Sequence, residues 1–256
     1  KLKDKTVFWI ALILLLQPYE WGRAIYAMIN PDYVVATGHY MPYAIRAQEA
    51  TANGNFFEVL CSNISDGQLY SNIWQVENGR LFQTAALFMF GMLLGRRKYL
   101  IKSEESVRFW KKMLKGAVLA FIPLYCLKTF VPDLLTNPSV QIPYKIAVPS
   151  YANFAFMIIL VSIFTLLWFK KEKGYGWQSL LIPYGRMSLT NYISQSIMGV
   201  IIYYGFGLAM YKYAGATASL LIALLIFTVQ LIFSRWWLAR HKQGPLEFLW
   251  RKGTWI

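Results

Sequence analysis

Residues 151–169, YANFAFMIILVSIFTLLWF, run for 19 positions without a charged side chain. A helix needs about 20 mostly apolar residues to cross the hydrocarbon core of a bilayer. Two further uncharged stretches follow, 187–211 with 25 residues and 213–234 with 22. The sequence therefore predicts an all-α, polytopic integral membrane protein.

Three weaker stretches extend the pattern toward the N-terminus. Residues 6–29 are apolar as far as Leu16 and then become polar, and residues 81–95 give only 15 uncharged positions. Residues 113–131 carry Lys115 and Lys128 near their ends, where long side chains can reach the interface. We therefore expect about six transmembrane helices in a single membrane domain, residues 1–256.

The composition excludes several other classes of protein. Of the residues, 57% are apolar and only 15% are charged, against roughly 25% charged in a typical soluble domain. A water-facing surface would need more charge, which excludes an ordinary soluble enzyme and a disordered tail. Two cysteines are too few for a disulfide scaffold.

The positive charge alternates with the apolar stretches. If the N-terminus is cytoplasmic, the inner segments are 1–5, 96–115, 170–186 and 235–256, and they hold 20 of the 26 Lys and Arg but 5 of the 12 acids. Lys and Arg collect in short cytoplasmic loops, so both termini are expected in the cytoplasm. A nucleic-acid-binding protein would not alternate its charge in this way.

The longest connection, residues 30–80, is expected to be an outer loop. It contains turn signals at Asn53-Gly54, Asp66-Gly67 and Asn78-Gly79. A loop of this length is usually functional or partly mobile.

The chain has two histidines, His39 and His241. His39 lies in the outer loop and is a weak candidate for a catalytic general base, because its ordinary pKa is near neutrality. No acid or nucleophile accompanies it at a diagnostic spacing, which favours a surface histidine. No metal-ligand spacing, phosphate-binding loop or nucleophile elbow is recognised.

Glu20 and Arg23 lie three residues apart, on one face of a helix, and are expected to pair. One interpretation is an intramembrane pair in a wet or protein-lined cavity, beside a helix loosened by Pro18 and Gly22. The other is that the span ends before Pro18 and this segment lies at the outer interface. The sequence leaves both open.

A polar stripe marks the fifth predicted span. Ser188, Asn191 and Gln195 occur at i, i+3 and i+7, so they share one helix face. Gln230 and Ser234 in the last span are candidate partners. Interhelical hydrogen bonding is favoured over a ligand-lined cavity, and both readings remain.

Several arginines are expected at the inner ends of the last two spans: Arg186, Arg235, Arg240 and Arg251. They could clamp a phosphate, either of an anionic lipid head group or of coenzyme A. Positive-inside anchoring in the membrane is the favoured alternative.

Residues 245–252, PLEFLWRK, predict a short interfacial helix. Pro245 suits the first helical position, and Glu247 precedes Arg251 by one helical turn. The candidate substrate-binding residues are Arg186, Ser188, Asn191, Gln195, Gln230, Arg235, Glu247 and Arg251.

Residues 185–196, GRMSLTNYISQS, followed by 244–251, GPLEFLWR, resemble the C-terminal signature of the YeiB-like bacterial inner-membrane proteins, the family of domain of unknown function 418. The stretches 52–58, ANGNFFE, and 90–96, FGMLLGR, are similar to earlier elements of that family. The resemblance runs from about residue 48 to residue 256.

This resemblance implies a place in the bacterial inner membrane and a grouping with transmembrane acyltransferases. Such a protein would pass an acyl group from a cytoplasmic carrier, with acyl-CoA as the candidate cofactor, to an envelope acceptor. The family's N-terminal half has no match in this sequence, so we expect a C-terminal portion or a truncated relative, with a missing half or a partner chain. The catalytic histidine of the wider group is not carried over to His39.

Two alternatives from other classes stand beside acyl transfer. One is a transport or envelope-maintenance protein that moves a small solute or lipid without covalent chemistry, with Glu20 and Arg23 as gating charges. The other is a structural membrane module that supports a partner chain.

Overall fold

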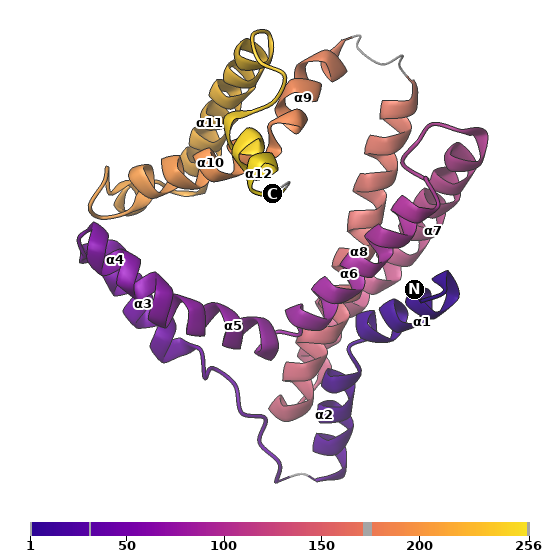
Figure 1. The fold of residues 1–256 in the computed structure, drawn as a ribbon. Coiled ribbons are helices and arrows are strands. Elements are labelled where there is room, and N and C mark those ends of the chain that lie inside the picture. Colours follow the sequence, from indigo (N-terminus) through magenta and orange to yellow (C-terminus); the bar gives the residue numbers. More distant parts are fainter. Residues whose placement is uncertain (1, 31, 171–175, 255–256) are drawn as a thin grey trace. The chain divides into compact units, whose positions relative to one another are not determined.

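The computed structural model describes residues 2–30, 32–170 and 176–254, and all regular secondary structure in them is helical. The chain divides into two compact units (Figure 1). Unit 1 comprises Lys1–Met41 and Leu69–Lys170, and unit 2 comprises Pro42–Gln68 and Lys171–Ile256. Parts of the basic segments predicted at 1–5 and 170–186 lie outside the described residues.

Unit 1 is organised around one long helix, α8, which packs against α7 and α2, while α1 packs against α6. Small buried residues on α8, among them Ala147 and Ala152, let neighbouring backbones approach closely. The helices of this unit are α1 (Asp4–Leu15), α2 (Pro18–Ile29), α5 (Gln68–Glu77) apart from its first residue, α6 (Arg80–Arg96), α7 (Glu104–Phe130), the 3₁₀ turn η2 (Pro132–Leu134) and α8 (Pro138–Lys170).

Three helical stretches are long and apolar enough to cross a membrane: Glu104–Leu134, Pro138–Lys170 and Ala216–Leu238. They contain or largely overlap the predicted spans 113–131, 151–169 and 213–234. Their apolar side chains are mostly exposed, as expected for surfaces that face lipid.

The first predicted span, 6–29, is wrong as a single helix. Gln17 adopts the left-handed conformation, with φ at 53°, and α2 begins afresh at Pro18. Proline lacks the N–H that would continue α1, and it disfavours helical geometry in the residue before it. Each of α1 and α2 has 12 residues, or about 18 Å, short of the roughly 30 Å core.

The fifth predicted span, 187–211, is wrong as a continuous helix beyond Tyr203. Helix α10 (Ser188–Tyr203) has 16 residues, and the chain then turns before the 3₁₀ turn η3 (Met210–Lys212). Gly207 lies so close to the carbonyl of Ile201 that a side chain could not fit there. The second predicted span, 81–95, corresponds to α6, which has 17 residues.

The connection predicted at 30–80 is largely helical. It contains α3 (Met41–Asn53), α4 (Phe56–Ser62), the π-helix η1 (Asn63–Gly67) and α5 (Gln68–Glu77). A capping box between Asn55 and Glu58 starts α4. A turn at Asn78-Gly79 follows α5 as predicted, α3 ends at Asn53 before a two-residue connection to α4, and Asp66-Gly67 lies within η1.

Unit 2 contains the C-terminal helices α9 (Trp177–Arg186), α10, α11 (Ala216–Leu238) and α12 (Pro245–Thr254). Helices α9 and α11 pack together, and α10 contacts α9, α11 and α12. Helix α10 runs beside α11 (Figure 1). The short helix predicted at 245–252 is confirmed as α12, with two further residues at its end.

Candidate functional site

A buried polar network joins α9, α10 and α11. The amide nitrogen of Asn191 donates to Ser234 Oγ and to the Tyr184 carbonyl, each at 3.0 Å. The amide nitrogen of Gln230 donates to the Asn191 carbonyl at 2.7 Å and to Ser194 Oγ at 2.8 Å. The predicted hydrogen bonding of Asn191 with the last span is therefore confirmed.

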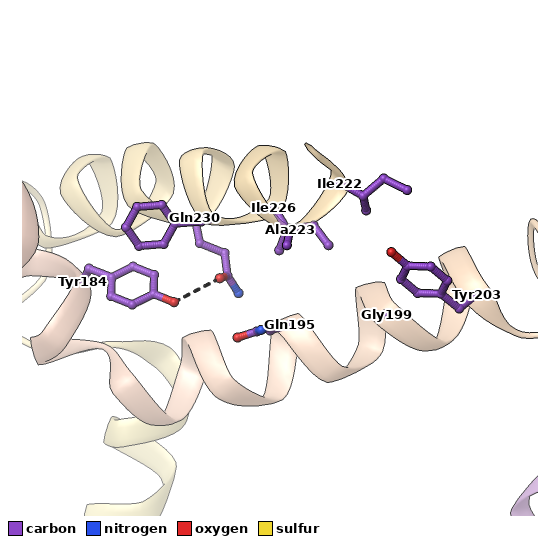
Figure 2. A pocket seen from close by; sticks show the side chains of 9 residues that line it. Tyr184, Gln195, Gly199, Tyr203, Ile222, Ala223, Ile226 and Gln230 are labelled. Carbon is purple, nitrogen blue, oxygen red and sulfur yellow. Dashed lines mark hydrogen bonds between the residues drawn. The ribbon is translucent and has the colours of Figure 1, made fainter. Parts of the chain in front are cut away.

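A pocket of about 220 Å³ lies between α10 and α11, closed on one side by α9 (Figure 2). At one end the Tyr184 hydroxyl donates to Gln230 Oε1 at 3.3 Å. Gln195 and Tyr203 of α10 form the opposite wall. The lining residues are Tyr184, Gln195, Gly199, Tyr203, Ile222, Ala223, Ile226, Phe227 and Gln230.

The structure thus divides the polar stripe predicted from the sequence. Asn191 is buried in the hydrogen-bond network, whereas Gln195 is exposed and lines the pocket together with Gln230. Ser188 is exposed at the start of α10 and does not line the pocket. Neither tyrosine of the pocket was predicted from the sequence: Tyr184 lies on α9 outside the stripe, and Tyr203 lies on the same face of α10 as the stripe, eight residues after Gln195.

Glu247 of α12 caps the N-terminus of α10. Its Oε1 accepts hydrogen bonds from the backbone amides of Leu189 at 2.8 Å and Thr190 at 3.1 Å, and its Oε2 accepts one from the Thr190 hydroxyl at 2.5 Å. The same hydroxyl accepts from the Leu246 amide at 3.2 Å. These bonds satisfy amides that have no partner within α10.

The electrostatics of this cap favour the ionised carboxylate. Burial alone would raise the pKa of Glu247, but hydrogen bonds from the Thr190 hydroxyl and from backbone amides outweigh it and hold the pKa below its ordinary value. Gly244 leaves the space that the carboxylate occupies, since a Cβ there would lie 2.0 Å from Glu247 Oε2. The cap therefore explains the glycine and the glutamate of the Gly-Pro-x-Glu part of the signature.

The turn between α11 and α12 gathers the basic side chains. Arg186 Nη2 donates to the Lys242 carbonyl at 2.8 Å, and Arg251 Nη1 donates to Gln243 Oε1 at 3.2 Å. We call residues 239–244 the basic turn. Beside it lies an open hollow of about 570 Å³, lined by Gln243, Phe248, Arg251 and Lys252.

Of the four predicted arginines, Arg251 lines this hollow, whereas Arg186, Arg235 and Arg240 do not. Arg235 is exposed on the last turn of α11 and makes no side-chain hydrogen bond within the described part of the chain. Arg240 lies over the Trp236 ring, 4.8 Å from its centroid, and donates to the Trp236 carbonyl.

In unit 1, Glu20 and Arg23 pair at 3.2 Å, and the Glu20 side chain is fully buried. Arg23 also donates to the Ala36 carbonyl at 3.3 Å. Trp21 donates to the Tyr151 hydroxyl of α8 at 2.7 Å. The pair is therefore enclosed by protein, on a helix that starts after the break at Gln17.

His39 has an acidic partner that the sequence did not reveal. Its Nδ1 lies 2.5 Å from Glu77 Oε1, and the backbone amides of Gly38 and His39 donate to the same carboxylate at 2.9 and 3.1 Å. The two residues are 38 positions apart, so no local spacing could show the pair. Among residues 2–30, 32–170 and 176–254, no group of three or more His, Cys, Asp or Glu is placed to hold a metal ion.

Comparison with known proteins identifies the C-terminal part. The family model described as "Protein of unknown function (DUF418)" matches residues 94–256. No solved structure matches the chain.

Three relatives are themselves uncharacterised. YxaH of Bacillus subtilis is 42% identical over 72 residues, which are 28% of this chain and 18% of YxaH. A 39.9 kDa protein from the amylase 3′ region of Bacillus acidopullulyticus is 45% identical over 76 residues, 30% of this chain and 21% of the relative. YeiB of Escherichia coli is 36% identical over 70 residues, 27% and 18% of the two chains. The matched segments thus span about a fifth of these longer relatives.

Proposed function

Since this chain belongs to the DUF418 family, we propose that it works in a bacterial inner membrane and binds the phosphate-bearing part of an amphipathic acyl donor at the basic turn. The observation that carries this proposal is the convergence of Arg186 and Arg251 on Lys242 and Gln243. Each guanidinium makes one side-chain hydrogen bond at this turn, and five N–H donors are available on each. The remaining donors suit a phosphate oxygen.

The charge around the turn supports an anionic ligand. Residues 235–254 contain five Lys and Arg against one acid, Glu247. That carboxylate accepts hydrogen bonds from three donors at the start of α10, and residues 235–254 keep a net charge of +4, five positive charges against one negative. A phosphate at the turn would replace water around several positive charges.

The resemblance to membrane acyltransferases suggests what carries the phosphate. A coenzyme A thioester brings a pyrophosphate and an acyl chain from the cytoplasm, and the turn is cytoplasmic in the orientation predicted from charge. An anionic phospholipid head group offers the same phosphate chemistry. In this proposal the chain contributes binding, and the acceptor site belongs to the longer protein that the relatives represent.

Binding to protein in zwitterionic nanodiscs tests the proposal. We expect hexanoyl-CoA to bind about tenfold more weakly to Arg186→Ala and to Arg251→Ala, because a lost charged hydrogen bond is worth roughly 1.5 kcal/mol or more. Arg108→Ala is the matched control, since Arg108 is an exposed arginine on α7. Unfolding temperatures of all variants establish that the fold is retained.

The arms of the experiment separate the two phosphate sources. If anionic phospholipid displaces hexanoyl-CoA and gives the same arginine dependence, the turn binds lipid head groups. Equal affinity of the parent and both arginine variants for either ligand would remove the basic turn as a binding site.

A second candidate function, transport without covalent chemistry, is favoured by one feature of unit 1. Helices α1 and α2 are separated by the left-handed Gln17, and the buried Glu20–Arg23 pair follows at once. Interrupted helices beside charged groups are typical of transporter sites. Proton flux into vesicles loaded with a pH-sensitive dye should then fall in Glu20→Gln but not in the exposed Glu49→Gln, and equal flux in both variants counts against this function.

A further inference from the structure

The pocket between α10 and α11 has a chemistry different from that of the basic turn. None of its lining residues carries a charge. The wall on α11 is apolar except for Gln230 and includes Ile222, Ala223, Ile226 and Phe227, and the wall on α10 carries an amide and a phenol (Figure 2). A charged group would lose its hydration here without gaining a partner. The ligand class is therefore uncharged.

Two polar groups in this pocket are available to a ligand. Gln230 is already engaged, because its nitrogen donates twice and its oxygen accepts from Tyr184. The Gln195 amide and the Tyr203 hydroxyl make no hydrogen bond to another described residue. Together they offer both donors and acceptors, so they match a ligand with one polar group.

The volume limits the length of that ligand. The pocket measures about 220 Å³, whereas pockets for drug-sized ligands measure about 300–1,000 Å³. The space therefore suits a short chain.

Gly199 shows that this space does not arise from close helix packing. Small residues at helix interfaces usually let two backbones approach, but a Cβ added at Gly199 would meet no atom within 4 Å. A glycine inside a helix costs about 1 kcal/mol relative to alanine. At Gly199 the absence of a side chain leaves room in the pocket.

We propose that the pocket lined by Gln195, Gly199 and Tyr203 is a binding slot for a short uncharged chain that ends in one hydrogen-bonding group, such as an alcohol, an amide or an acyl ester. The apolar wall on α11 takes the chain, and the α10 wall takes the polar end. This assignment concerns the pocket alone, so it holds whichever anion binds the basic turn.

Photolabelling tests the slot directly. The probe is hexanol that carries a diazirine on its chain, applied to the full chain in nanodiscs, with adducts mapped by mass spectrometry. We expect adducts to concentrate on pocket residues such as Tyr184 and Tyr203, and 1-hexanol to displace them at lower concentration than 1-dodecanol or the hexanoate ion.

Matched glycine variants separate the slot from labelling by the bulk membrane. Gly199→Leu fills the pocket and should lower its adducts at least tenfold, whereas Gly116→Leu on α7, another glycine with open space around it, should leave them unchanged. Gln195→Leu should weaken competition by 1-hexanol about fivefold, since it removes one neutral hydrogen bond.

Three results would overturn the assignment. Adducts spread evenly along α7, α8 and α11 would show partition into lipid. Labelling that persists in Gly199→Leu would place the probe elsewhere. Equal displacement by hexanoate and hexanol would contradict an uncharged ligand. Because none of these readouts involves coenzyme A or an arginine variant, failure here leaves the proposal for the basic turn intact.

Discussion

The substitution Glu247→Ala removes the cap that ties α12 to α10. Two backbone amides and the Thr190 hydroxyl lose their acceptor. Loss of an N-cap costs about 1 kcal/mol, and a hydrogen bond to a charged group about 1.5–3 kcal/mol when water is excluded. Glu247 is only partly buried, so water replaces some of the lost bonding. We expect a total of about 2–3 kcal/mol for the contact between the two helices.

Hydrogen exchange of the backbone amides measures this loss locally. With about 1.4 kcal/mol for each factor of ten, the amides of Leu189, Thr190 and Phe248 should exchange roughly 30- to 150-fold faster in the variant. Glu104→Ala is the control, because Glu104 lies in the first turn of α7 without a cap hydrogen bond. It should change exchange by a few-fold at most.

The distribution of the effect is as informative as its size. Amides in the middle of α11 belong to the same unit but do not depend on the cap, so they should keep their protection. Unchanged exchange at Leu189 and Thr190 in Glu247→Ala would refute the capping role. Uniformly faster exchange over all of unit 2 would mean that the cap supports the whole unit rather than one contact.

Three further predictions concern pH, backbone conformation and burial. The pKa of Glu247 lies below its ordinary value of 4.5, so the stabilisation by this carboxylate is complete above pH 4.5 and is lost as the pH falls through the lower pKa of the folded state. The hydrogen-exchange rates of the parent and Glu247→Ala should therefore converge at low pH. A constant difference between them down to pH 2 would contradict this. Gly79→Ala should lower the stability of unit 1 by about 1–3 kcal/mol, because φ is +63° and the new Cβ would lie 2.6 Å from the buried amide oxygen of Gln17. The control Gly91→Ala, at a position with open space, should leave the stability unchanged. Equal unfolding temperatures of the two variants in detergent would count against the reasoning. Asn191→Leu should lower the free energy of unfolding by about 2–4 kcal/mol, because it leaves buried polar groups without hydrogen-bond partners. The substitution Ser188→Ala, at an exposed position, should not change this free energy. An Asn191→Leu protein as stable as the parent would show that the network is dispensable.

Hydropathy was sufficient to locate the long helices and poor at finding their interruptions. Helices α8 and α11 follow from uncharged length alone, because apolar residues are favourable at every lipid-exposed position. Helix α7 follows from an apolar stretch that carries Lys115 and Lys128 near its ends. The break at Gln17 depends on one backbone conformation beside Pro18, and a count of apolar residues averages over it. The end of α10 at Tyr203 depends on contacts of Gly205 and Gly207 with distant or preceding carbonyls, which hydropathy does not represent.

Helical periodicity predicted part of the candidate site. The rest was not predicted, because its residues lie far apart in the sequence. The stripe containing Asn191 and Gln195 was visible because a helix repeats, and its partners Gln230 and Ser234 were visible as polar residues in an apolar span. The role of Glu247 depends on Thr190, 57 positions earlier. His39 and Glu77 are 38 positions apart in the sequence. Such pairs carry no local signal.

The cap on α10 also has a consequence for biosynthesis. Leu189 receives its acceptor from a residue 58 positions later, and a ribosome adds about 5–20 residues each second. For roughly 3–12 s after its own synthesis, the start of α10 must therefore rely on water, lipid head groups or the insertion machinery for hydrogen bonds. A nascent chain arrested before Glu247 should expose this segment to added protease, and release of the arrest should protect it.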